Sequence, residues 1–134
     1  MKNTAILCVD DEVLILEALE TELHRAFGDD YVYEFAESAE EALEIMSELE
    51  QTDVELKVII TDWLMPRMRG DELLLKVQQK RPNTVKIILT GQADQKAIEA
   101  ACLHSNLDYC INKPWDSKAL IHLLETSLAH YGYK

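Results

Sequence analysis

Three carboxylates, a hydroxyl and an ammonium group each follow an apolar run of this chain. Asp10 and Asp11 follow residues 5–9, Asp62 follows 58–61, Thr90 follows 85–89, and Lys113 follows 109–112. If these four runs are parallel strands of one sheet, the five side chains converge at its carboxyl edge. Open α/β sheets place their active sites at that edge. The set as a whole therefore predicts a functional site.

The chemistry open to this set is phosphoryl transfer assisted by a metal. Asp10, Asp11 and Asp62 offer the hard oxygen ligands that Mg²⁺ prefers, and a divalent cation would relieve the repulsion among them. Lys113 adds a compact positive charge, and Thr90 adds a hydrogen-bond donor for a phosphate oxygen. Phosphoryl transfer needs mainly positioning and charge neutralisation. A carboxylate can act as the nucleophile and form an aspartyl-phosphate, and Asp62 is the best placed candidate.

Each of these features has a simpler explanation when it is taken alone. An Asp-Asp pair before a helix is more often an N-cap, because carboxylates are favourable at a helix N-terminus. Asp62 could be another cap. Thr90-Gly91 could be an ordinary turn, and Lys113-Pro114 could simply end a strand. Their joint occurrence at four strand ends of one short chain favours the site.

The elements that must position these residues alternate along the chain. The patterns predict strands over 4–9, 31–36, 57–61, 85–89 and 108–112, and helices over 13–27, from Ser38 onward, over 71–80, near 94–103 and from near Ser117. Strands alternating with helices imply parallel pairing with right-handed crossovers. Residues 57–61 are apolar on both faces, as in a central strand, and 31–36 alternate like a strand exposed on one face. We expect one α/β domain spanning 1–134.

Local signals support the helix boundaries. Ser38 is a candidate N-cap with Glu41 three residues later, the pattern of a capping box. Ile15, Leu19, Leu23 and Ala26 recur at helical spacing within 13–27, and Gly28 ends this pattern. The last helix presents a stripe of Leu120, Ile121, Leu124 and Leu128.

The composition excludes several classes of protein. The 134 residues carry a net charge of -12 without a basic stripe, which argues against nucleic-acid binding by this chain. Cys8, Cys102 and Cys110 lack metal-ligand spacing; Cys8 and Cys110 fall in predicted strands and are expected to be small buried apolar residues, as in a reducing compartment. Neither a signal peptide nor an apolar run of the ~20 residues that span a bilayer is present. We expect a cytoplasmic protein with no membrane association.

The combined motifs resemble the receiver domain of bacterial two-component response regulators over essentially the whole chain. The segment Asp62-Trp63-Leu64-Met65-Pro66-Arg67-Met68-Arg69-Gly70 is similar to the phosphoacceptor signature of the family, an Asp followed by x-x-Met-Pro-x-Met-x-Gly. Val9-Asp10-Asp11-Glu12 resembles the acidic pair after the first strand, Leu89-Thr90-Gly91 the hydroxyl position, and Asn112-Lys113-Pro114-Trp115-Asp116 the lysine–proline turn.

This resemblance implies a flavodoxin-like (βα)5 doubly wound parallel sheet of order 2-1-3-4-5. It implies that Asp62 accepts a phosphoryl group from a phosphohistidine. Asp11, Asp62 and the backbone carbonyl of Leu64 would ligate Mg²⁺ (or Mn²⁺), with Asp10 acting directly or through water. Lys113 would pair with Asp62 and then with the phosphoryl group, and Thr90 would move to meet a phosphoryl oxygen. The Lys113–Pro114 bond is expected to be cis.

One position departs from the family pattern. Receivers commonly place an aromatic switch residue three positions before the lysine, which here is Cys110, whereas the aromatic Tyr109 lies four before it. A shift of one residue reverses the face of a strand. Either Tyr109 occupies the switch position through a bulge, or the usual coupling between threonine and aromatic is absent; Tyr109 could also simply pack under a helix.

Two further positions tune the lifetime of the phosphorylated state in the family. They lie two residues after the acceptor, here Leu64, and two after the threonine, here Gln92. Leu64 is bulky and apolar, so we expect it to hinder an attacking water.

The resemblance implies a phosphorelay switch whose partners are a sensor histidine kinase or a phosphotransfer protein, with a homodimer through the fourth and fifth helices as a further expectation. Such a chain is not an enzyme, since it modifies only its own Asp62. The alternatives are a phosphorylation-independent binding module of the same fold and a Mg²⁺-dependent phosphohydrolase. The hydrolase is disfavoured because Leu64 stands where a second acid is usual. The residues after the last helix are too few for an output domain, so a stand-alone receiver and a piece of a longer protein both remain open.

Overall fold

The computed structural model describes residues 3–91, 100 and 107–132. Its elements, in chain order, are β1 (Thr4–Val9), α1 (Val13–Phe27), β2 (Val32–Ala36), α2 (Ala39–Gln51), β3 (Glu55–Asp62), α3 (Gly70–Lys80), β4 (Val85–Thr90), β5 (Tyr109–Asn112) and α5 (Ser117–Gly132). The helix expected near 94–103, together with Gln92 and Cys102, lies outside the described residues.

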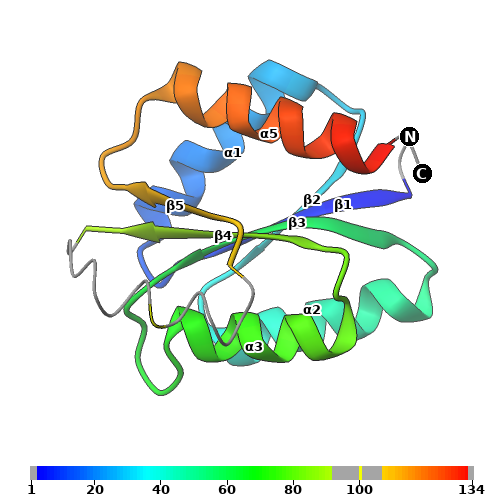
Figure 1. Ribbon diagram of the computed structural model, residues 1–134, viewed down its shortest axis with the longest axis vertical. Helices are drawn as coiled ribbons and strands as arrows, with labels where there is room; N and C mark the ends of the chain where they lie inside the picture. Colours follow the sequence, from blue (N-terminus) through cyan, green and yellow to red (C-terminus); the bar gives the residue numbers. More distant parts are fainter. Residues whose placement is uncertain (1–2, 92–99, 101–106, 133–134) are drawn as a thin grey trace.

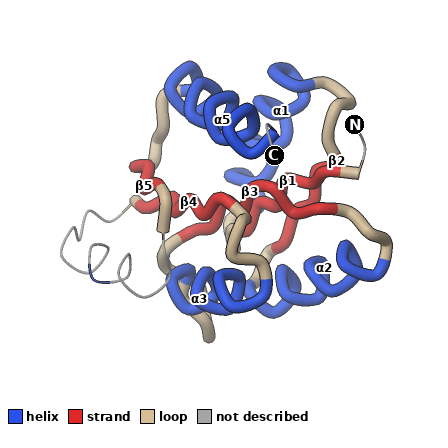
Figure 2. Tube along the Cα trace, turned by 45° about the vertical axis from the view of Figure 1, so that its right-hand side comes forward, coloured by secondary structure: helices blue, strands red, loops and turns tan. Residues whose placement is uncertain are grey.

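The five strands form one sheet of order β2-β1-β3-β4-β5, and every neighbouring pair is parallel. Helices α1 and α5 cover one face of this sheet, and α2 and α3 cover the other (Figure 1). The three layers are also distinct in the turned view (Figure 2). The predicted α/β fold with a flavodoxin-like strand order is therefore confirmed.

The alternation of side chains along each strand divides the core into two clusters, one on each face of the sheet. In β1, Ile6 and Cys8 pack with α1 and α5, whereas Leu7 and Val9 pack with α2 and α3. Both faces of β1 and β3 are covered, so these strands need apolar residues at successive positions. This explains why their sequences read as continuous apolar runs.

Strand β2 differs from its prediction. The alternation of its sequence indicated one exposed face, but four of its five residues are partly buried and Ala36 is fully buried. Tyr33 and Phe35 pack toward α1 and α5, and Val32 packs toward α2 and α3. The prediction was wrong because helices cover both faces even at this edge of the sheet.

The helix termini largely follow the sequence signals. Gly28 ends α1 with a φ of 60°, a conformation in which a glycine avoids the steric cost of a Cβ. The buried residues of α1 are Leu16, Leu19 and Leu23. Of the residues at helical spacing, Ile15 is only partly buried and Ala26 is exposed.

The predicted N-cap of α2 is confirmed. The Ser38 hydroxyl accepts a hydrogen bond from the Glu41 backbone N–H at 3.1 Å. The Glu41 carboxylate accepts from the backbone N–H of Glu37 at 2.8 Å, whereas a full capping box would use the N–H of Ser38.

The two described cysteines have different environments. Cys8 is fully buried, as expected, but Cys110 is exposed. The prediction for Cys110 was wrong because β5 is a four-residue edge strand in which only Ile111 packs on the core. Across the described part of the chain, none of the helices has the length and apolar character needed to cross a membrane.

Candidate functional site

The predicted site residues meet at the carboxyl edge of the sheet. Asp10 and Asp11 directly follow β1, Asp62 is the last residue of β3, Thr90 is the last of β4, and Lys113 directly follows β5. These four strands are consecutive neighbours in the sheet. The convergence expected from the sequence is therefore confirmed.

The two-residue period of the strands explains which of these side chains meet. Asp10, Asp62 and Lys113 each lie two residues after a residue that packs on the α1 and α5 side of the sheet. Those preceding residues are Cys8, Ile60 and Ile111. Thr90 instead lies two residues after Ile88, which packs on the opposite side.

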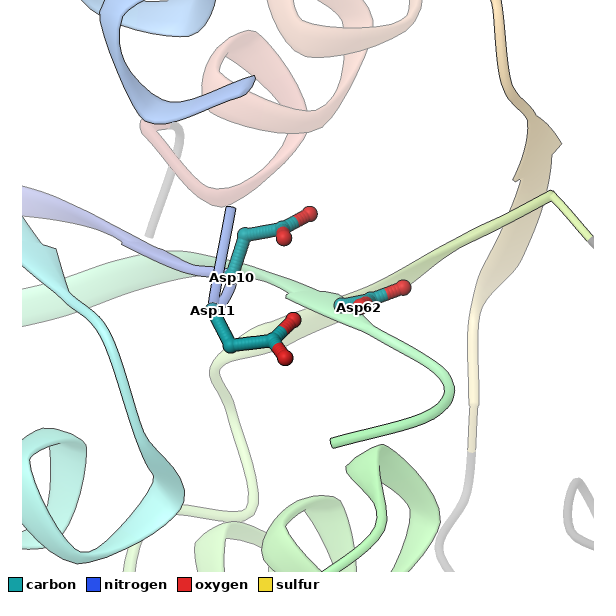
Figure 3. A group of neighbouring side chains, drawn as sticks. All are labelled: Asp10, Asp11 and Asp62. Atoms are coloured by element: carbon teal, nitrogen blue, oxygen red, sulfur yellow. The ribbon is translucent and has the colours of Figure 1, made fainter. Parts of the chain in front are cut away.

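The three aspartates form a compact cluster. Each offers one carboxylate oxygen, and these oxygens all lie within 4.8 Å of one another. Figure 3 shows the carboxylates of Asp10 and Asp11, at the end of β1, pointing to the same side as that of Asp62. Asp10 is fully buried and Asp62 is 7% exposed, whereas Asp11 is exposed. A set of carboxylates this close fits a hard divalent cation such as Mg²⁺ or Mn²⁺.

The ammonium of Lys113 contacts two of the three aspartates. Its Nζ donates hydrogen bonds to Asp10 Oδ2 at 2.8 Å and to Asp62 Oδ1 at 3.1 Å. The Glu12 carboxylate is 3.6 Å from the same nitrogen. Burial lowers the pKa of Lys113, but the hydrogen bonds to Asp10 and Asp62 outweigh this effect, and the net pKa is raised. Lys113 therefore stays charged at neutral pH.

Asp62 has an unusual electrostatic environment. Burial, together with the nearby charge of Asp10, raises the pKa of Asp62 from 3.8 to about 6, and the hydrogen bond from Lys113 opposes that rise only in part. A strongly perturbed carboxyl in a cleft is a common property of functional residues. The cluster thus carries more negative charge than one ammonium can neutralise.

A cavity of about 310 Å³ opens over Asp62. Its lining residues are Asp11, Glu12, Asp62, Leu64, Thr90, Gly91 and Lys113. Asp10 is not among them, because it lies buried behind the cavity with its carboxylate on Lys113. The predicted nucleophile Asp62, the ammonium of Lys113 and the hydroxyl residue Thr90 therefore line the same cavity.

The loop after Asp62 is tied to the sheet and to α3. The backbone N–H of Trp63 donates to the carbonyl of Leu89 at 3.0 Å, and that of Gly70 donates to the carbonyl of Trp63 at 2.9 Å. A Cβ on Gly70 would collide with the backbone carbonyl of Asp62. Glycine at this position therefore lets α3 begin directly against the backbone of Asp62.

The position of Tyr109 bears on the open question of the switch aromatic. Strands β4 and β5 pair in one register from Ile87–Tyr109 to Thr90–Asn112, with no shift. Tyr109 therefore lies two residues before Ile111, on the α1 and α5 side, and 40% of it is exposed. The regular register supplies no bulge that would turn Tyr109 toward the side of Thr90.

Two other expectations can be compared with the structure. The Lys113–Pro114 bond is cis, as expected. Sequence reasoning gave no role to Glu12, although its carboxylate lines the cavity and its backbone N–H donates to Asp10 Oδ1 at 2.8 Å. Its place directly after the acidic pair was the signal that could have identified it.

Comparison with known proteins identifies related sequences and structures. The family model of the response regulator receiver domain matches residues 6–125. A chemotaxis protein CheY homologue of Campylobacter jejuni is 34% identical over 124 residues, covering 92% of this chain and 91% of that protein. The hydrogenase transcriptional regulatory protein HoxA of Cupriavidus necator is 29% identical over 131 residues, and this chain spans 98% of its own length but only 25% of HoxA.

Solved structures agree with these matches. The signal receiver domain of an HD domain-containing protein from Pseudomonas fluorescens superposes with a TM-score of 0.85 at 30% identity, covering 98% of each chain. A CheY-like response regulator receiver domain protein from Methanospirillum hungatei gives a TM-score of 0.81 at 28% identity, covering 95% of this chain and 94% of the other.

The burial of Asp62, together with its repulsion by Asp10, predicts that Asp62→Asn stabilises the metal-free protein. Because the folded state raises the pKa of Asp62 from 3.8 to about 6, the ionised carboxylate costs stability above pH 6. We expect a gain of about 1–3 kcal/mol in the free energy of unfolding at pH 7.5 in EDTA. The gain should shrink as the pH falls from 6 to 3.8, because folded wild type takes up the proton first. Urea denaturation across this range measures it.

Asp29→Asn is the matched control for this experiment, because Asp29 is exposed and lies outside the cluster. It should change the free energy of unfolding by less than ~0.5 kcal/mol. A less stable Asp62→Asn variant at pH 7.5 would show that burial and repulsion do not make the ionised Asp62 costly to the folded state.

Proposed function

The chain belongs to the response regulator receiver family, and on that premise we propose that it accepts a phosphoryl group on Asp62 and thereby switches a partner-binding face. The donor would be a phosphohistidine of a sensor histidine kinase or of a phosphotransfer protein. The Asp62 carboxylate would attack the phosphorus, and the bond from phosphorus to the histidine nitrogen would break. The imidazole leaves with the electron pair of that bond and takes up a proton.

The observation that carries this proposal is the environment of the Asp62 carboxylate. It lines an open cavity, and the Nζ of Lys113 donates to its Oδ1 at 3.1 Å. A carboxylate that served only as a helix cap would not need a partly buried lysine and two further aspartates beside it. The simpler explanations open to each residue alone do not account for this arrangement.

Asp62, Lys113 and Thr90 have different proposed roles in the phosphoryl transfer. Asp62 is the nucleophile. Lys113 neutralises the carboxylate before transfer and would follow the phosphoryl group afterwards, since one ammonium offers three donors. The Thr90 hydroxyl would donate to a phosphoryl oxygen from the opposite side of the cavity. These are the positioning and charge-neutralising roles on which phosphoryl transfer depends.

A divalent cation, Mg²⁺ or Mn²⁺, would supply charge neutralisation at the phosphoryl oxygens when bound. Asp11 and Asp62 line the cavity and are the proposed direct ligands, together with the backbone carbonyl of Leu64. Asp10 is buried behind them on Lys113, which supports a role for it through water. The chemistry of the chain would be confined to phosphorylation and dephosphorylation of its own Asp62.

The surroundings of the cavity favour a protein as the phosphodonor. Val13 and Leu14 directly follow Glu12 at the start of α1, and both are exposed, as is Leu64 on the cavity itself. Exposed apolar side chains around a polar site are typical of protein interaction surfaces. We propose no nucleic-acid contact for this chain, because its net charge is -12.

The proposed output is a population shift at the face formed by β5, α5 and the fourth helix. Thr90 would begin that shift when it meets the phosphoryl group. The role of Gln92 in the lifetime of the phosphorylated state and the homodimer through the fourth and fifth helices also stay proposals, because Gln92 and that helix fall outside the described residues.

A second candidate is a binding module that does not respond to phosphate. The observation in its favour is the exposed Tyr109 on the side of the sheet away from Thr90, with Cys110 in the position that usually holds an aromatic. The third candidate, a phosphohydrolase, gains no support, since Leu64 stands two residues after Asp62 at the cavity.

Phosphorylation of Asp62 can be measured directly by intact mass. After incubation with acetyl phosphate and Mg²⁺, the wild type should gain one phosphoryl group, and Asp62→Asn should gain none. EDTA should suppress the gain in the wild type. A folded wild type that binds Mg²⁺ but gains no phosphoryl group would favour the phosphate-independent module.

Leu64 should lengthen the life of the aspartyl-phosphate. Its side chain is exposed at the cavity, where it can obstruct a water that approaches the phosphorus. We expect Leu64→Asn to dephosphorylate several-fold faster, as followed by the decay of the phosphorylated mass after removal of the donor. Leu75→Asn, which replaces an exposed leucine on α3, should decay like the wild type. An unchanged or slower decay of Leu64→Asn would contradict this role.

A further inference from the structure

A tryptophan links the turn that carries Lys113 to the first helix. The indole Nε1 of Trp115 donates to both carboxylate oxygens of Glu22, at 3.0 Å and 3.1 Å. Glu22 lies on α1, 93 residues away in the sequence. Both residues are partly buried, and Trp115 packs on the core that α1 and α5 form with the sheet. A hydrogen bond to a carboxylate is among the stronger kinds.

This contact holds the middle of a short turn whose two ends are also tied. At one end, the backbone N–H of Lys113 donates to the carbonyl of Thr90 at 2.8 Å. At the other, the Asp116 carboxylate accepts from the backbone N–H of Ala119 at 2.9 Å and so caps α5. Trp115 adds a third tie, which fixes the turn against α1.

The position of Lys113 matters because its ammonium contacts carboxylates that also belong to the proposed cation site. Lys113 Nζ contacts Asp62, a proposed direct ligand of the cation, and Asp10, which is proposed to act through water. An ammonium held firmly on these oxygens opposes the cation, and one that is held loosely opposes it less. The same loosening would slow phosphoryl transfer, because a displacement on the order of 1 Å at a reacting centre is costly.

We propose that Glu22 and Trp115 are positioning residues for Lys113: the hydrogen bond between them fixes the turn after β5, keeps the ammonium on Asp62, and sets the balance between cation affinity and the rate of phosphorylation. The expected change in the rate of phosphorylation rests on the proposed function. The expected change in cation affinity rests only on the geometry of Lys113 and the three carboxylates.

The test measures two quantities on the full chain of each variant, the dissociation constant for Mg²⁺ by calorimetry and the rate of phosphorylation by acetyl phosphate at saturating Mg²⁺. Glu22→Ala removes the acceptor, and Trp115→Phe removes the donor but keeps a ring. Each should slow phosphorylation roughly three- to tenfold and tighten Mg²⁺ binding roughly two- to fivefold. The double variant should add little to either single one, since both break the same contact.

Opposite changes in the two quantities distinguish positioning from a merely structural role. A variant that is partly unfolded would lose both cation affinity and rate. Loss of a negative charge alone would weaken Mg²⁺ binding. Glu17→Ala, which removes an exposed carboxylate from the same helix, measures the size of this charge effect. Glu22→Gln keeps an oxygen acceptor for the indole and should stay within about twofold of the wild type in both quantities.

The outcomes separate this proposal from the proposed function. If Glu22→Ala leaves Mg²⁺ affinity unchanged or weakens it, the positioning role is wrong, whatever happens to the rate. The same conclusion follows if Glu22→Gln behaves like Glu22→Ala. If the wild type takes up no phosphoryl group, the proposed function fails, and tighter Mg²⁺ binding by Glu22→Ala would still support the positioning role.

Discussion

Three carboxylates held side by side at the edge of a sheet repel one another, and this repulsion determines how the surrounding site is built. Their oxygens lie within 4.8 Å, and two of the three residues are buried. Lys113 offsets part of the charge through its contacts with Asp10 and Asp62. Burial and, next, the charge of Asp10 nevertheless raise the pKa of Asp62 to about 6. The three carboxylates therefore carry more negative charge than Lys113 neutralises, and a divalent cation can neutralise the excess.

The architecture of the sheet brings these charged side chains together. Parallel strands deliver their carboxyl ends to one edge, and the two-residue period places Asp10, Asp62 and Lys113 on the side of α1 and α5. Apolar residues on both faces of β1 and β3 provide the stability that the charged edge does not. Gly70 lets α3 begin against the backbone of Asp62, and Trp115 ties the turn of Lys113 to α1.

The sequence predicted those parts of the fold and site that depend on local pattern. The alternation of strands and helices, the Ser38 cap and the convergence of the site residues at the sheet edge follow from periodicity and from motifs at strand ends. The strand order follows from the resemblance to the receiver family. The prediction of burial failed where it depends on which distant helices cover a strand. Strand β2 is half-buried on both faces, and Cys110 on the edge strand β5 is exposed. The contact between Trp115 and Glu22 could not be predicted, because nothing in the local pattern relates residues 93 positions apart.

The requirement of the aspartate cluster for a cation can be measured as the free energy of unfolding at increasing Mg²⁺ and constant ionic strength. If the three carboxylates form one cation site, Mg²⁺ should stabilise the wild type by about 1.4 kcal/mol for each tenfold rise in concentration above its dissociation constant. The Asp11→Asn variant, which lacks one exposed carboxylate of the cluster, should need much more Mg²⁺ for the same gain. A free energy of unfolding that does not change with Mg²⁺ in the wild type would contradict a cation site built from these residues.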